Sequence, residues 1–203
     1  VVEKRKSLQS WVLLLSILTF LLSVVGTFLV RSGILTSVHT FALDPSRGIY
    51  ILIFTTLLAA YSLLLFGYKT RKSFTSDYFT FFSKEGAILV NNTIMIIVCG
   101  IVLLGTIYPL IIEALVNTKI SVGEPYYNSV VVPIMIPAIL IMGFGPSLSW
   151  GRNNFFNVLK KNYPSILLTL ILVAVFFVIY KSYSLMGVIG ITLSFWIIIN
   201  NLI

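Results

Sequence analysis

Six long runs without a charged side chain constrain this chain more than any other feature of its sequence. The hydrocarbon core of a bilayer is about 30 Å thick, and a helix that rises about 1.5 Å per residue needs about 20 apolar residues to cross it. Each run is long enough for this. The sequence therefore predicts an all-α fold, a polytopic bundle of about six transmembrane helices. The expected spans are residues 9–30, 49–68, 88–112, 130–148, 163–180 and 184–203.

The composition excludes a soluble domain. Hydrophobic residues make up 58% of the chain and charged residues only 10%, which is far more apolar than an average globular protein. The runs are continuously apolar for about twice the length of a barrel strand, which favours helices over a β-barrel. The loops between the runs are short, so residues 1–203 are expected to form a single transmembrane domain within the lipid bilayer.

The net charge of +8 reflects membrane topology, because the basic residues lie in the loops between the spans. A nucleic-acid footprint would instead gather on one face of a folded domain, so no nucleic-acid partner is expected. Arg31, Arg47, Lys119 and Lys181 fall on one side of the membrane, and ten basic residues fall on the other. These ten are Lys4, Arg5, Lys6, Lys69, Arg71, Lys72, Lys84, Arg152, Lys160 and Lys161. The positive-inside rule then makes the amino end cytoplasmic.

The only histidine, His39, lies in the first outward segment and is bracketed by Arg31 and Arg47. A neutral imidazole is a common ligand of metals and of haem iron, and the guanidinium fork of arginine suits carboxylates such as haem propionates. From the residues alone, two interpretations of His39 stay open, a solvated loop histidine and a ligand. The single cysteine has no companion with metal-ligand spacing.

The sequence around His39 resembles the CcmF-type haem lyases of bacterial cytochrome c maturation. The resemblance rests on Gly-Thr-Phe-Leu-Val-Arg-Ser-Gly at 26–33, Thr-Ser-Val-His-Thr-Phe-Ala at 36–42 and Asp-Pro-Ser-Arg-Gly at 44–48. It continues in the same order with Ser-Lys-Glu-Gly at 83–86, Asn91-Asn92, Gly-Thr-Ile-Tyr-Pro at 105–109 and Ser-Val-Gly-Glu-Pro-Tyr-Tyr-Asn at 121–128. It runs from the start to about Pro146 and is weak in the last two helices.

The resemblance implies a multi-pass protein of the bacterial inner membrane with its His39 loop in the periplasm. In that family a haem chaperone delivers haem b, two outward histidines hold its iron, and its vinyl groups join the cysteine thiols of an apocytochrome c. His39 corresponds to the second of these histidines. Arg31 and Arg47 are candidate propionate contacts. The implied partners are the haem chaperone, apocytochrome c and other membrane subunits of the maturation machinery.

The resemblance also implies that this chain is an internal fragment of a longer protein. The tryptophan-rich loop, the first outward histidine and the membrane histidines of a second haem b site would lie outside it. That second haem site would be incomplete here. The chain is therefore expected to be part of a thioether-forming haem lyase and inactive alone, and no catalytic residue is assigned within it.

Two other functions stay open from the sequence. The fourth run contains Pro133, Pro137 and Pro146, so it should kink or break, as helices of secondary transporters do. The spans lack Asp, Glu, Lys and Arg, which counts against a transporter. A noncatalytic assembly subunit is the second alternative, and it predicts that His39 is dispensable. A further expectation is that Trp11, Trp150 and Trp196, near span ends, serve as interface anchors.

Overall fold

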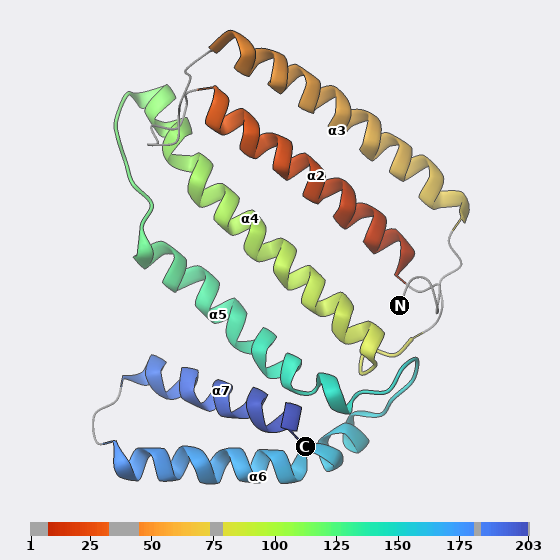
Figure 1. Cartoon of the computed structure of the whole chain (residues 1–203), viewed down its shortest axis with the longest axis vertical. Coiled ribbons are helices and arrows are strands. Elements are labelled where there is room, and N and C mark those ends of the chain that lie inside the picture. The colour runs from red at the N-terminus through yellow and green to blue at the C-terminus, as the bar shows by residue number, and fades with distance from the viewer. Residues whose placement is uncertain (1–7, 33–44, 74–78, 181–183, 203) are drawn as a thin grey trace. The chain divides into compact units, whose positions relative to one another are not determined.

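The computed structural model of the chain describes residues 8–32, 45–73, 79–180 and 184–202 (Figure 1). Within these residues, six helices are long and apolar enough to cross a membrane, which confirms the predicted all-α fold class. They are α2 (Gln9–Arg31), α3 (Pro45–Ser73), α4 (Lys84–Val116), α5 (Glu124–Gly143), α6 (Phe155–Ile179) and α7 (Leu185–Leu202), and a short 3-10 helix η1 (Gly145–Ser147) follows α5.

The contacts between helices divide the chain into two compact units, residues 1–77 and residues 78–203. The first unit holds α2 and α3, and the second holds α4 to α7. The expectation that residues 1–203 form a single domain stays a prediction.

The first unit is a hairpin in which α2 packs along α3. Hydroxyl groups within these helices donate to the carbonyl oxygen four residues earlier, as Thr19 does to Leu15 at 2.7 Å and Thr55 to Ile51 at 2.6 Å. Lipid offers no hydrogen-bond partner, so a polar side chain in a span must find one inside the protein. The hydroxyl groups are therefore hydrogen-bonded within their own helices, and the helices stay continuous at these residues.

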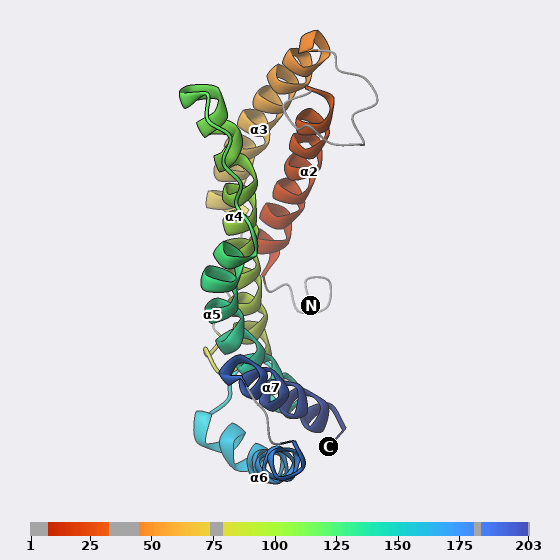
Figure 2. The same ribbon diagram turned by 90° about the vertical axis from the view of Figure 1, so that its left-hand side faces the viewer.

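In the second unit, α5 contacts both α4 and α7, and α7 also contacts α6 (Figure 2). The residues buried within this unit include Leu148, Val158, Leu193 and Ile199. The buried face is small, and many large apolar side chains are exposed, as on a surface solvated by lipid.

Trp196 of α7 belongs to this buried core. Its side chain is only 6% exposed, and its indole Nε1–H donates to the carbonyl oxygen of Leu140 at 3.0 Å. Its ring lies 4.9 Å, centroid to centroid, from the ring of Phe144. Gly143 makes this packing possible, because a Cβ there would overlap the indole nitrogen. The expectation that Trp196 is an interface anchor was therefore wrong.

Helix α5 is continuous through Pro133 and Pro137 and ends at Gly143. Pro146 lies in η1, directly after the helix. The break in the fourth run thus falls near residue 144, whereas the expected span continued to 148. A proline inside a helix removes one hydrogen bond, and neighbouring helices can compensate for this in a membrane.

Two segments of the second unit are joined by hydrogen bonds in what we call the loop latch. They are residues 80–86, which include the first turn of α4, and residues 149–153. The backbone N–H of Thr80 donates to Gly151 O at 2.9 Å, and the N–H of Lys84 donates to Ser149 O at 3.0 Å. In return, the N–H of Gly151 donates to Glu85 Oε2 at 2.8 Å. The carboxylate of Glu85, only 4% exposed, thereby joins the start of α4 to the loop that leads into α6.

The first turn of α4 explains why the loop latch forms at this point. Ser83 is fully buried and caps the helix, accepting from the N–H of Gly86 at 3.1 Å through its Oγ. Gly86 must be glycine, because a Cβ would overlap the carbonyl oxygen of Phe81. Gly151 has φ +79°, in the left-handed region that favours glycine. The Ser-Lys-Glu-Gly motif therefore has a structural role.

Candidate functional site

The sequence-predicted site lies at the end of the α2–α3 hairpin where α2 ends and α3 begins. His39 lies outside the described residues. Arg31 is the last residue of α2, and its side chain is exposed. Arg47 lies in the first turn of α3, and its side chain is outside the described part of the structure.

The contact between Ser32 and Gly48 brings the two arginines to the same end of the hairpin. Ser32 caps α2, donating its backbone N–H to Phe28 O at 2.8 Å. A Cβ on the buried Gly48 would lie 3.0 Å from Ser32 Cα, so the start of α3 touches the end of α2. Arg31 and Arg47 each adjoin one contact residue, and consecutive Cα atoms are about 3.8 Å apart. The segment that carries His39 therefore starts and finishes at the same end of the hairpin, next to Arg31 and Arg47.

The predicted topology places Lys119 on the same side of the membrane as Arg31, so the start of α5, in the second unit, is a second outward element. Glu124 Oε1 accepts from Asn128 Nδ2 at 3.2 Å within the first turn. The rings of Tyr126 and Tyr127 lie 5.2 Å apart, edge to face. A Cβ on Gly105 of α4 would lie 2.8 Å from the Tyr127 hydroxyl oxygen, so both rings pack on this glycine. The glycine of the Gly-Thr-Ile-Tyr-Pro motif thus lets α5 approach α4 closely.

The electrostatics of this second outward element are weak. Lys119 Nζ lies 3.8 Å from Glu113 Oε1, but the two side chains are 84% and 46% exposed. An exposed ion pair of this kind contributes about 0–1 kcal/mol. Asn117 ends α4 in the left-handed conformation, with its N–H donating to Glu113 O at 3.0 Å. These contacts shape a turn and form no binding site.

The described residues contain no group of three or more His, Cys, Asp or Glu that could hold a metal ion. Haem iron needs no such cluster, because one or two axial side chains bind it. Sequence reasoning missed the buried role of Glu85. The sequence feature that could have indicated this role is a carboxylate in the first turn of α4, two residues after the serine cap.

Comparison with curated proteins decides the family. The chain is 39% identical over 202 residues to the cytochrome c-type biogenesis protein CycK of Rhizobium meliloti, covering 100% of this chain and 30% of that protein. It is 38% identical over 198 residues to the cytochrome c-type biogenesis protein CcmF of Escherichia coli, covering 97% of this chain and 31% of that protein. The chain is homologous to the CcmF-type cytochrome c biogenesis proteins.

A third CcmF-type relative, the cytochrome c-type biogenesis protein CycK of Bradyrhizobium diazoefficiens, is 43% identical over 175 residues, or 86% of this chain and 26% of that protein. The chain thus spans less than a third of the length of these relatives. No protein-family model matches the chain, and no solved structure matches it. The CcmF-type homology covers all six helices, including the last two, where the sequence motifs are weak.

Proposed function

We propose that this chain takes part in cytochrome c maturation as a haem-handling part of a CcmF-type membrane protein. The observation that carries the proposal is homology along the whole chain to proteins named for cytochrome c biogenesis. Six helices of membrane-spanning length support a multi-pass protein. The distribution of basic residues favours a cytoplasmic amino end and a periplasmic His39 segment.

Within this function, His39 is an axial ligand of haem iron. It is the only histidine in the chain, and a neutral imidazole nitrogen is a standard ligand of haem iron. The Ser32–Gly48 contact supports the assignment, because it fixes where the histidine segment starts and ends. A histidine on a segment anchored at both ends costs less entropy to order around a ligand than one on a free chain.

Arg31 and Arg47 hold the haem propionates. A guanidinium group presents its donors in a planar fork that matches a carboxylate, and such charge-assisted pairs are stronger than neutral hydrogen bonds. Haem has two propionates, and this end of the hairpin brings together two arginine positions. Within the described part of the chain, the exposed side chain of Arg31 forms no ion pair with a carboxylate.

The substrates are haem b, which a haem chaperone delivers, and an apocytochrome c. Each cysteine S–H adds across one haem vinyl group to give a thioether, so the addition consumes no oxidant or reductant. The haem itself supplies the reacting vinyl groups. The residues of this chain would hold the iron and the propionates, and thereby orient the vinyl groups toward the thiols.

Haem loading of the full-length protein tests the function. We expect wild-type protein purified from the membrane to carry haem. The double variant Arg31→Ala, Arg47→Ala should bind haem at least about tenfold more weakly, because each charge-assisted hydrogen bond contributes about 1.5–3 kcal/mol. The measurement is the haem-to-protein ratio from the absorbance of the reduced haem.

Arg152→Ala is the matched control, because Arg152 is exposed and lies in the loop latch, on the opposite side of the predicted topology. Its haem content should equal that of the wild type. Wild-type protein without haem would contradict the proposed function, whereas full haem loading of the double variant would contradict only the role of the two arginines.

A further inference from the structure

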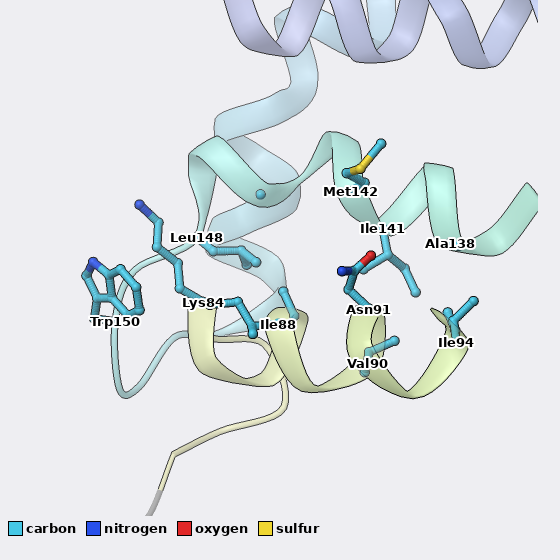
Figure 3. Close-up of a pocket in the computed structure, with 12 residues that line it drawn as sticks. Lys84, Ile88, Val90, Asn91, Ile94, Ala138, Ile141, Met142, Leu148 and Trp150 are labelled. Carbon is cyan, nitrogen blue, oxygen red and sulfur yellow. The ribbon is translucent and has the colours of Figure 1, made fainter. Parts of the chain in front are cut away.

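A groove in the second unit lies between the first third of α4 and the end of α5 (Figure 3). Its volume is about 300 Å³, within the range of small-molecule sites. Most of its wall is aliphatic, with Ile88 and Ile94 from α4 and Ala138 and Ile141 from α5. An apolar ligand would therefore fit the wall, and the polar residues at one end decide which ligand it is.

Lys84 and Trp150 form the polar end of the groove. The ammonium nitrogen of Lys84 lies 5.5 Å from the centroid of the Trp150 ring, a cation–π contact. The backbone of Lys84 is fixed by the loop latch through its bond to Ser149 O. The residues that line the groove include no aspartate or glutamate. This end therefore suits an anion.

The length of the groove matches one leaflet of a bilayer. Its lining on α4 runs from Lys84 to Ile94, a rise of ten residues, which corresponds to about 15 Å along a helix. Half of a hydrocarbon core of about 30 Å is the same length. Lys84 and Trp150 lie at the end where lysine and tryptophan are favoured at a membrane interface. An acyl chain lying along the groove would end near the bilayer midplane.

We propose that this groove binds one anionic phospholipid, with its phosphate at Lys84 and an acyl chain between α4 and α5. The predicted topology assigns Lys84 to the cytoplasmic side, where anionic lipids concentrate. None of the residues that line the groove belongs to the segment that carries His39. Lipid binding at α4 therefore stands or fails independently of the proposed haem function.

The shape of the groove favours a lipid over another transmembrane helix. A covering helix, from a second copy or from another part of a longer protein, would pack along most of α4, which continues to Val116. The groove covers only the first third of α4 and carries a cation at one end. A helix in that place would have to neutralise Lys84 within the interface, whereas a lipid phosphate does so by its own chemistry.

The test is native mass spectrometry of the full-length protein in detergent, titrated with palmitoyl-oleoyl phosphatidylglycerol. We expect wild-type protein to bind a first lipid more tightly than Lys84→Glu by about tenfold, because a cation near a lipid phosphate becomes an anion. Lys160→Glu is the matched control, since Lys160 is an exposed cation of α6 outside the groove. Its first-lipid affinity should stay within twofold of the wild type.

Two further variants test the lipid site if Lys84→Glu does not fold. Lys84→Met removes the charge and keeps the length, and Ala138→Phe fills the groove from α5; each should weaken phosphatidylglycerol binding. Phosphatidylcholine carries a choline cation beside its phosphate, so its titration should show weaker binding to wild-type protein and a smaller dependence on Lys84. Equal affinity of the wild type for the two lipids, or unchanged phosphatidylglycerol binding by both Lys84→Met and Ala138→Phe, would overturn the proposal.

Discussion

Cells that depend on a full-length protein carrying His39→Ala are expected to lose most of their mature cytochrome c. Under the proposed function, this change removes an axial ligand and deprives the haem of a direct bond to the protein. Loss of a residue that merely supports a metal ligand typically weakens metal binding about 10–100-fold, so loss of the ligand itself should cost at least as much. The yield of mature cytochrome should therefore fall by about tenfold or more.

The measurement is haem-stained cytochrome c in cells that lack their own copy of the gene, with the haem content of the purified variant alongside. Ser37→Ala, a change in the same segment at a residue with no expected iron bond, is the control and should keep full yield. Membrane levels of each variant are compared by immunoblot. An unchanged yield for His39→Ala would favour the noncatalytic assembly subunit.

Replacing Gly143 with valine is expected to give the largest loss of stability in the second unit. The Cβ would overlap the indole nitrogen of Trp196 and lie 2.6 Å from its Cδ1. The indole must move, and its hydrogen bond to Leu140 O is then lost. Overpacking and a lost hydrogen bond together cost about 3 kcal/mol. The temperature at which half of the full-length protein loses its monodisperse gel-filtration peak should fall by about 5 °C or more.

A matched valine at Gly100 separates this clash from the general cost of a β-branched residue. Gly100 lies within α4, and a Cβ there would meet no atom within 4 Å. Gly100→Val should therefore leave the midpoint nearly unchanged. In a Trp196→Leu background, Gly143→Val should cost much less than in the wild type, because the two residues are in contact. Equal losses in both backgrounds would show that the indole is not the cause.

The number and type of helices could be predicted from sequence because lipid imposes the pattern directly. A helical span needs about 20 apolar residues, and the helix satisfies its own backbone hydrogen bonds within the lipid. The role of Trp196 could not be predicted in this way. A tryptophan near a span end usually lies at the interface, and only the space left by Gly143, 53 residues earlier in the chain, makes it part of the core.

The loop latch shows the same limit of local sequence rules. Ser83 before a helix predicts an N-cap, and the structure has one. That Glu85 accepts from Gly151, 66 residues away, depends on how α4, α5 and α6 fold together. No spacing rule reports a contact at such a separation. The lipid groove at Lys84 likewise needs two helices and a loop in place before it exists.

For the proposed haem site, the sequence alone identified the candidate residues His39, Arg31 and Arg47. The resemblance to the CcmF-type family then gave each of them a proposed role. His39 alone is compatible with a solvated loop. The bracketing arginines became informative because a hairpin returns the chain to its starting point, as the Ser32–Gly48 contact shows.

The most direct test of the central claim is the content of c-type cytochromes in source cells from which the gene for this protein has been deleted. We expect covalently bound haem to disappear from all c-type cytochromes and to return when the full-length gene is restored, while b-type haem proteins stay at normal levels because haem synthesis is intact. Normal c-type cytochromes in the deletion strain would contradict a role in cytochrome c maturation.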